Sequence, residues 1–238
     1  MNREKSGGSR GRAANLLTWL LLGSSGVVLG GRTGVLPVVR WTGEWRSWLA
    51  HRRALAVLPD LYHAHPSIGN ILARDSAVMF TDYECPYCAR QESLLASSPE
   101  MGLKLRITYV NLPLTEIHAA AMKGARVAYC ASGVSDFPRV HSALFASSRW
   151  KQSATFGDWL TAAEPAPDQR RAILNCMESD SSRLAVVRDQ EIARRIGLSA
   201  TPTWIISGRL ISGVLSADAL LQLTRDSSTA LLSDLDIH

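Results

Sequence analysis

The sequence lacks several features that mark whole classes of protein. Its 238 residues contain no visible repeat of 20–50 residues, which argues against solenoid and propeller folds. Its 10 Pro and 17 Gly are too few for a wholly disordered chain. The 46% hydrophobic content is enough for one substantial domain with a real core.

The greater part of the chain also lacks an excess of positive charge. Residues 1–53 hold nine Lys and Arg against two acidic residues, whereas residues 54–238 hold 17 basic and 19 acidic residues. The net charge of +5 therefore belongs to the N-terminal part. Nucleic-acid binding needs a basic stripe on the folded surface, so no nucleic-acid partner is expected.

Charge is absent altogether from one N-terminal segment. Residues 1–12 contain four basic residues, and the largely apolar residues 13–31 that follow carry no charge. This pattern is typical of a secretory signal or a membrane anchor, and 19 residues just suffice to cross a bilayer. No clear A-x-A site follows and Trp19 lies inside the run, which favours a retained single-pass anchor over a cleaved signal and a secreted form. A helix buried in the domain is the third alternative.

Residues 32–66 join this segment to the main domain. Trp41, Trp45 and Trp48 lie here among arginines, with apolar residues near helical spacing. Aromatic and basic residues suit a membrane interface. The segment is predicted to be either a juxtamembrane linker or an extra helix packed on the domain.

A strand–helix–strand unit opens the main domain. Residues 76–81 form a short apolar run typical of a buried strand, and residues 89–96 have the pattern of a helix. Residues 103–110 alternate between apolar and polar side chains, which predicts a second strand that places Leu103 and Leu105 on one face. The unit is therefore βαβ.

A block of helices separates this unit from a second half. Five helices are predicted between about residues 113 and 197, at 116–132, 136–147, 156–163, 168–178 and 182–196. Strands at 203–206 and 210–211, a helix at 216–223 and a polar tail at 224–238 follow. The order β-α-β, helical block, β-β-α predicts an α/β thioredoxin fold over residues 67–223 with a helical insertion between its halves.

The sequence Cys85-Pro86-Tyr87-Cys88 falls at the start of the first helix. Thiol–disulfide exchange needs an attacking thiolate and a second thiol that resolves the mixed disulfide. Cys85, at the exposed amino end of the helix, is the expected nucleophile because the helix dipole lowers its pKa. Cys88, nearly one turn further and partly sheltered, is the expected resolving thiol. Pro86 suits the first turn, where a missing N–H costs nothing.

Two cysteines with this spacing also occur in zinc sites, in which Cys130 and Cys176 would be the other ligands. Those two lie far apart and lack paired spacing, which argues against zinc. Thr201-Pro202 leads into the late strand, where the thioredoxin fold has a cis proline against the active-site cysteines. A cis Thr201–Pro202 bond is therefore predicted.

Three segments carry a family resemblance, and they are Phe80–Cys88, Asn111–Leu114 with the following His118, and Ile196–Thr203. Together they resemble the DsbA-like thiol–disulfide oxidoreductases of the thioredoxin superfamily. The resemblance implies a location outside the cytoplasm and protein thiols or disulfides as substrates. The expected catalytic residues are Cys85, Cys88 and Pro202, and the expected substrate contacts are Pro86, Tyr87 and Thr201.

The chain departs from the family pattern in two places. Met79 stands where many members have a buried acidic proton acceptor, so water or Glu84 is expected to handle the proton of Cys88. Pro-Tyr replaces the Pro-His of strongly oxidising members. Together with the negative charges of Asp82 and Glu84, this predicts a less depressed pKa for Cys85 and a less oxidising protein.

Outside the active site, Cys130 and Cys176 lie on two predicted helices of the insertion. An oxidising compartment favours a structural disulfide between them, which would stabilise the fold by roughly 3–4 kcal/mol; two buried free thiols are the alternative. His118 and His141 are expected to be packed or surface residues rather than catalytic ones.

The sequence as a whole predicts a membrane-anchored, extracytoplasmic enzyme that oxidises protein thiols and is reset by a membrane redox partner. No metal or organic cofactor is implied. A reductase or isomerase of the same fold is one alternative. A peptide-binding or chaperone module with incidental redox chemistry is the other.

Overall fold

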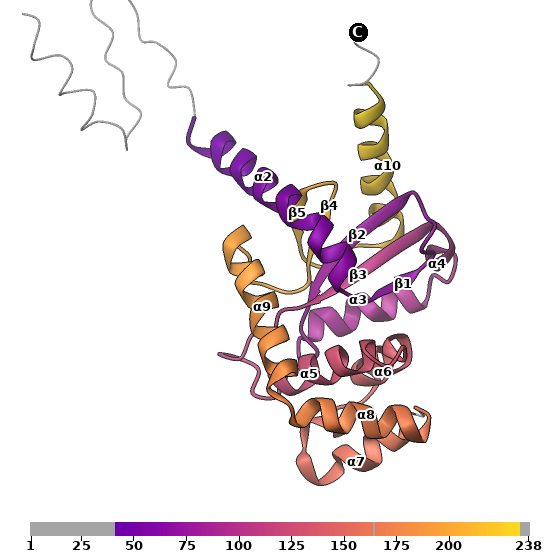
Figure 1. Cartoon of the computed structure of the whole chain (residues 1–238). Helices are drawn as coiled ribbons and strands as arrows, with labels where there is room; N and C mark the ends of the chain where they lie inside the picture. The colour runs from indigo at the N-terminus through magenta and orange to yellow at the C-terminus, as the bar shows by residue number, and fades with distance from the viewer. Residues whose placement is uncertain (1–40, 164, 234–238) are drawn as a thin grey trace, which may run out of the picture. The chain divides into compact units, whose positions relative to one another are not determined.

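The computed structural model of the protein describes residues 41–163 and 165–233 (Figure 1). The predicted membrane segment at 13–31 lies outside these residues. Within them, every helix is too short or too polar to qualify as a membrane span. The chain divides into two units at Leu49 and Ala50, and the packing described below belongs to the second unit.

The order of the elements is mixed α/β. The strands are β1 (Ser67–Gly69), β2 (Asp75–Thr81), β3 (Leu105–Asn111), β4 (Thr203–Ile206) and β5 (Arg209–Ser212). The helices outside the insertion are α2 (Trp41–Ala64), α3 (Pro86–Ala96), α4 (Met101–Lys104) and α10 (Ala217–Ser233). The insertion holds α5 (Ala121–Ser132), α6 (Phe137–Ala146), the 3₁₀ helix η1 (Arg149–Lys151), α7 (Ser153–Ala162), α8 (Pro167–Glu178) and α9 (Asp180–Ile196).

One five-stranded sheet has the order β1-β3-β2-β4-β5. The central strand β2 pairs in parallel with β3 and antiparallel with β4. Because β2 and β3 are parallel, Thr81 and Asn111 end them side by side at one edge of the sheet. The fold predicted from the sequence, a thioredoxin fold with a helical insertion, is confirmed.

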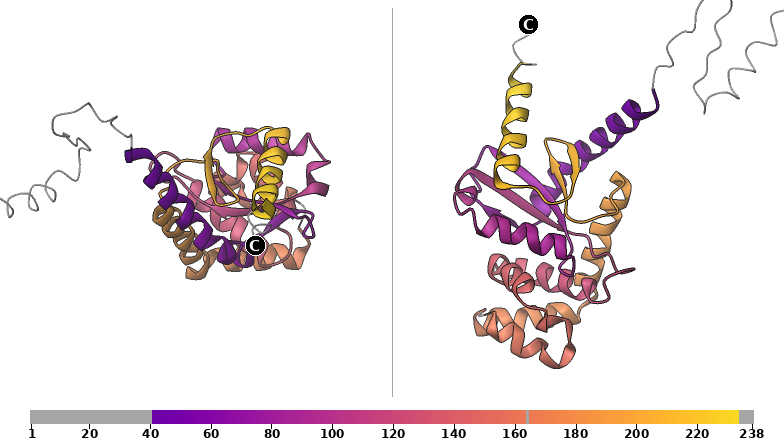
Figure 2. Two further views of the ribbon diagram at one scale, coloured as in Figure 1. Left: turned by 90° about the horizontal axis from the view of Figure 1, so that it is seen from above. Right: turned by 180° about the vertical axis from the view of Figure 1, so that it is seen from behind.

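The two faces of the sheet pack against different helices. Met79 of β2 belongs to a buried cluster that includes Leu220 of α10 and many residues of the insertion. Its neighbours Val78 and Phe80 belong to a second cluster with Ala54 of α2. This alternation follows from the two-residue period of a strand. Helices α3, α6 and α8 lie successively further from the sheet in both the front and back views (Figure 2).

Several element boundaries differ from those predicted, among them these three. Residues 103–104 belong to α4, and Leu103 is 74% exposed, so the strand expected from residue 103 begins only at Leu105. Helix α5 begins at Ala121 instead of residue 116, and in the loop before it the N–H of Leu114 donates to the side chain of Asp82. Helix α10 continues to Ser233, past the predicted end at Leu223. The three-residue strand β1 was too short to be recognised.

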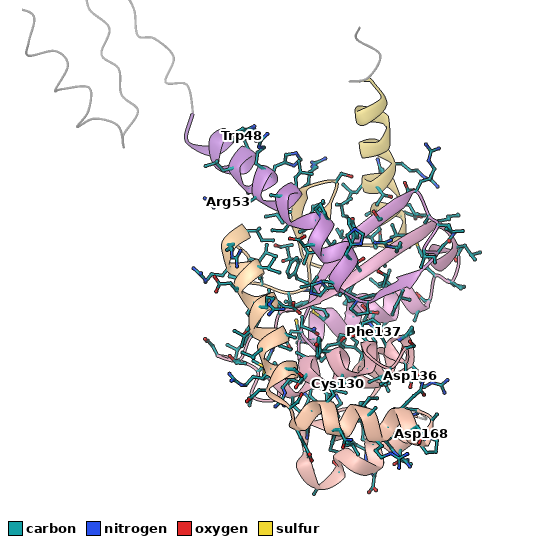
Figure 3. The ribbon with its side chains drawn as sticks, viewed as in Figure 1. Trp48, Arg53, Cys130, Asp136, Phe137 and Asp168 are labelled. Carbon is teal, nitrogen blue, oxygen red and sulfur yellow. A yellow bond between two sulfur atoms is a disulfide. The ribbon has the colours of Figure 1, made fainter. Side chains whose placement is uncertain are left out.

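A disulfide joins two helices of the insertion. Cys130 of α5 (Figure 3) and Cys176 of α8 have an S–S distance of 1.99 Å and a Cα–Cα distance of 5.7 Å. Because the sulfur atoms of Cys130 and Cys176 are bonded to each other, neither can be a ligand in a four-cysteine zinc site.

The carboxylate of Asp189 holds α9 to the end of β3. Its Oδ2 atom accepts hydrogen bonds from the backbone N–H and the side-chain amide of Asn111, each at 3.2 Å. Its Oδ1 atom lies 2.7 Å from Nε2 of His65. The neighbouring Gln190 donates to the carbonyl of Pro113 at 2.9 Å. The last helix of the insertion is therefore fixed to the sheet beside the end of β2.

Candidate active site

Cys85 occupies the position just before α3, at the end of the sheet where β2 stops. Its N–H donates to the carbonyl of Asp82 at 3.1 Å, which closes a tight turn between strand and helix. Its own carbonyl accepts the N–H of Ala89 at 3.1 Å and so begins the helix. Pro86 is the first helical residue, where its lack of an N–H is harmless. The sulfur therefore lies at the positive end of the helix dipole.

Both active-site cysteines are free thiols, and both are buried. Cys85 is 4% exposed and Cys88 is 0% exposed. The sequence led us to expect an exposed Cys85, and this expectation was wrong because the segment before β4 covers the sulfur. Tyr87, between the two cysteines, is 62% exposed and forms part of the surface beside them.

The covering segment is Thr201-Pro202, whose peptide bond is cis. The thiol of Cys85 donates to the carbonyl of Thr201 at 3.3 Å. Thr203 then pairs with Phe80 across β4 and β2, which fixes the segment beside the end of β2. The structure thus brings together Cys85, Cys88, Thr201 and Pro202, with Pro86 and Tyr87 exposed at their edge.

The pKa of Cys85 is lowered from 9.0 to about 5. The largest cause is a hydrogen bond with the thiol of Cys88, and further hydrogen bonds from Thr201 and from the N–H groups of Cys88 and Tyr87 act in the same direction. Burial opposes them. Cys85 is therefore a thiolate at neutral pH, which is the form that attacks disulfides.

The pKa of Cys88 moves in the opposite direction. Burial raises it well above the ordinary value for a thiol, and the neighbouring Cys85 raises it further. Hydrogen bonds from the backbone of Asp82 and the hydroxyl of Thr81 only partly offset this. Cys88 is therefore a neutral thiol that donates to the Cys85 thiolate, and the two sulfurs have unlike roles.

The sequence led us to expect Asp82 and Glu84 to oppose a thiolate, but neither is among the causes that shift the pKa of Cys85. Asp82 is buried, and its carboxylate accepts the N–H of Glu84 at 2.8 Å, the N–H of Leu114 at 2.9 Å and Nδ1 of His118 at 2.7 Å. These donors compensate its charge, which is why Asp82 does not oppose the lowered pKa of Cys85.

The side chain of Glu84 is likewise engaged elsewhere. One carboxylate oxygen lies 3.0 Å from Nζ of Lys151, and the other accepts the N–H of Ala120. Both contacts reach into the helical insertion. Glu84 is therefore part of the connection between the active-site turn and the insertion.

The two histidines have different surroundings. His118 lies in the loop before α5, not on the predicted helix, and contacts Asp82. His141 is 1% exposed on α6, with Nδ1 at 2.9 Å from the hydroxyl of Tyr83 and Nε2 at 3.1 Å from Glu92. Sequence reasoning missed this buried cluster, because its members lie up to 58 residues apart and match no motif.

The fold, the two unlike thiols at the start of α3 and the facing cis proline are the features expected of a thioredoxin-fold protein. The family model described as Thioredoxin matches residues 63–225, and the chain belongs to this family.

Solved structures show the same fold. A linker-deletion mutant of Proteus mirabilis ScsC aligns with a TM-score of 0.68 and 20% identity, over 94% of this chain and all of that one. The thiol-disulfide exchange protein alpha-DsbA2 from Wolbachia pipientis aligns with a TM-score of 0.66 and 17% identity, over 76% of this chain and 97% of that one.

A curated relative of a different kind is the Na(+)/H(+) antiporter NhaA 3 of Salinispora tropica. It is 26% identical over 145 residues, which make up 61% of this chain and 22% of the antiporter. The chain thus spans about a fifth of the length of this relative.

Proposed function

We propose that this protein oxidises thiols of other proteins, outside the cytoplasm, with its Cys85–Cys88 disulfide. The observation that carries the proposal is the pKa of Cys85, lowered to about 5. A stabilised Cys85 thiolate stabilises the reduced form of the enzyme, and a stable reduced form makes the oxidised form a strong oxidant.

The reaction proceeds in two exchanges. A substrate thiolate attacks the Cys85 sulfur, the Cys85–Cys88 bond breaks, and Cys88 leaves with the electron pair and takes up a proton. A second substrate thiolate then attacks the substrate sulfur of the mixed disulfide. Cys85 leaves as a thiolate, the substrate is oxidised to a disulfide, and the enzyme is left reduced. The low pKa of Cys85 makes it a good leaving group in this second step.

Thr201 and Pro202 are proposed to align the substrate chain. They lie directly before β4 and cover the Cys85 sulfur, so an extended peptide beside them would place its own sulfur in line for attack. The exposed Pro86 and Tyr87 offer apolar contacts beside this position. The Cys130–Cys176 disulfide supports an oxidising compartment, where such bonds persist.

A membrane redox protein is proposed to reoxidise the Cys85–Cys88 pair. The uncharged residues 13–31 support a membrane location, since they have the length and composition of an anchor. The likeness to part of an antiporter adds support, because a related domain occurs there within a membrane protein.

The reduction potential of the Cys85–Cys88 pair tests the direction of the reaction. It is measured by equilibrating the protein with glutathione buffers and counting free thiols by mass spectrometry after acid quenching. An oxidase is expected to have a potential above about −180 mV, whereas a value near about −270 mV would identify a reductase. A Cys85→Ser/Cys88→Ser variant that retained full activity in cells would instead identify a peptide-binding module.

A further inference from the structure

The proton of Cys88 poses a chemical problem that the site described above does not solve. When Cys88 attacks, its thiol must lose a proton to become a thiolate. When Cys88 is the leaving group, the thiolate that forms must gain one. Cys88 is 0% exposed, so bulk water does not reach it directly. A group inside the protein is needed to exchange this proton.

The groups that the sequence suggested do not fill this role. Met79 is fully buried and apolar. Glu84 is occupied by Lys151 and by the N–H of Ala120. The hydroxyl of Thr81 lowers the pKa of Cys88 by donating its hydrogen to the thiolate, but it is too weak a base to keep a proton.

Another acidic residue lies one helical turn beyond Cys88. Glu92 is four residues further along α3, so both side chains lie on the same face of the helix. One oxygen of Glu92 is 3.1 Å from Nε2 of His141, and that ring bonds the hydroxyl of Tyr83 at 2.9 Å. The other oxygen, Oε1, and Nε2 of His141 are both buried without a hydrogen-bond partner in the described part of the chain. Oε1 is therefore free to accept a proton.

Tyr83 connects this cluster with the active site. It lies two residues before Cys85 and is buried, with 4% exposure. The pKa of its hydroxyl is raised by burial first, then by the charges of Glu92 and Cys88, so its hydroxyl lies within electrostatic range of both.

The cluster also borders a cavity of about 500 Å³ between α3, α6 and the β1–β3 end of the sheet. Glu92 and His141 line its wall together with the exposed residues Arg90, Ser93 and Ser142. The cavity is large enough for several water molecules and reaches the surface through these exposed residues. It offers a route by which the cluster exchanges protons with solvent behind the active-site helix.

We propose that the Tyr83–His141–Glu92 cluster carries the proton between Cys88 and the water-accessible cavity. This proposal rests on the thiol–disulfide exchange proposed above. When Cys88 resolves a mixed disulfide, its proton passes to the cluster, its sulfur attacks Cys85, and the substrate sulfur leaves as a thiolate that is protonated by solvent. When Cys88 is the leaving group, the cluster returns the proton to it.

The ionisable groups around this cluster would each influence its pH dependence. Tyr109 of β3 approaches Glu92, with its hydroxyl at 3.4 Å from Oε2. Arg90 of α3 lines the same cavity. Helix α6 contributes His141, the turn before α3 contributes Tyr83, and α3 also carries Cys88. The wider wall of the cluster is aromatic, with Phe137 at the start of α6 (Figure 3) in contact with the His141 ring.

The test isolates the step in which Cys88 acts. Reduced protein is mixed with excess oxidised glutathione, samples are quenched in acid, and mass spectrometry follows the Cys85–glutathione mixed disulfide as Cys88 resolves it. Wild type, Glu92→Gln, Tyr83→Phe and the control Ser142→Ala are compared from about pH 5 to pH 8. Ser142 lines the same cavity as His141 but does not belong to the Tyr83–His141–Glu92 cluster, so Ser142→Ala is the matched control.

We expect Glu92→Gln to slow resolution at least tenfold near pH 6, since a positioned base contributes on this order or more. The rate of resolution by Glu92→Gln should then rise about tenfold per pH unit, because hydroxide must remove the proton of Cys88. The rates of wild type and Ser142→Ala should rise less steeply with pH. Tyr83→Phe, which removes one oxygen only, should change the rate in the same direction.

Resolution by Glu92→Gln and Tyr83→Phe at the wild-type rate and pH slope would overturn the proposal. So would slower resolution with an unchanged pH slope, which would indicate a structural effect. The rate at which iodoacetamide alkylates Cys85 should be the same in all four proteins. A failure of thiol–disulfide exchange itself is distinguishable, because wild type would then form no mixed disulfide, and the direction of exchange is tested separately by the reduction potential.

Discussion

The sulfur of Cys85 donates to the carbonyl of Thr201 at 3.3 Å, and the hydroxyl of the same threonine, which has no hydrogen-bond partner in the described residues, lowers the pKa of Cys85. One residue thus acts on the nucleophile through its backbone and its side chain. The hydroxyl stabilises the thiolate, whereas the carbonyl accepts the neutral thiol.

Replacing the hydroxyl by a methyl group, Thr201→Val, should therefore raise the pKa of Cys85. A hydrogen bond to a charged group is worth about 1.5–3 kcal/mol, which corresponds to about one to two pKa units. The pKa is read from the thiolate absorbance at 240 nm as the pH is varied. Thr203→Val is the matched control, because the hydroxyl of Thr203 bonds Ala200 and Ser212 instead. An equal pKa shift in Thr201→Val and Thr203→Val would contradict the stabilisation of the Cys85 thiolate by the Thr201 hydroxyl.

The unlike pKa values of the two thiols predict selective alkylation. Iodoacetamide should modify Cys85 in the reduced protein with a rate that follows a titration at about pH 5, because its pKa is lowered to about 5. Cys88 should stay unmodified at neutral pH, since burial raises its pKa. Mass spectrometry of tryptic peptides measures the alkylation, and the Cys85→Ser and Cys88→Ser variants leave one cysteine each so that the two sites are followed separately. A rate that rises only near pH 8 to 9 would refute the lowered pKa.

The stability of the reduced protein should depend on pH through Cys85. Its folded pKa is below its unfolded value of 9.0, so its stabilisation is full above that value and is lost as the pH falls toward 5. The difference in free energy of unfolding between reduced wild type and Cys85→Ser should accordingly shrink between about pH 8 and pH 5. Urea denaturation at each pH measures it. A constant difference would show that the thiolate does not stabilise the fold.

The Cys130–Cys176 disulfide closes a loop with a sequence separation of 46 residues. Chain-entropy reasoning gives such a loop roughly 3–4 kcal/mol of stabilisation. A Cys130→Ala/Cys176→Ala variant should lose about this much free energy of unfolding, measured with the active-site pair held reduced. The reduction potential of Cys85–Cys88 should stay unchanged, because the bond lies within the insertion. A changed potential would show coupling between the two cysteine pairs.

Asp82 receives three hydrogen bonds in a buried position, so its removal should be costly. Asp82→Ala leaves the N–H groups of Glu84 and Leu114 without acceptors, which predicts a loss of about 2–4 kcal/mol in the free energy of unfolding. Asp82→Asn keeps one acceptor oxygen and should lose less. Chemical denaturation of both variants measures the difference. Equal stability of Asp82→Ala and wild type would contradict the role of this carboxylate.

Much of the site was predictable from local sequence. The spacing of Cys85 and Cys88 after an apolar strand and before a helix indicates the redox pair, and Thr201-Pro202 before the late strand indicates its neighbour. Each of these signals depends only on residues that are adjacent in the sequence, so the sequence alone reveals it. The helical insertion and the succession of elements from β2 onward followed from the sequence in the same way.

What could not be predicted depends on contacts between distant residues. The burial of Cys85 requires knowing how closely Thr201 approaches it, 116 residues later in the chain. That Asp82 does not oppose the lowered pKa of Cys85 depends on Leu114 and His118, which compensate its charge. The partnership of Glu92 with His141 likewise forms only when α3 and α6 pack.

The helical insertion is tied to the sheet at both ends of its own sequence, by Asp82 where it begins and by Asp189 where it finishes. Because hydrogen bonds to the sheet hold both ends, a movement of the insertion over the cysteines would have to break them. Adjustment of the surface beside the cysteines then falls to exposed side chains, of which Tyr87 is 62% exposed.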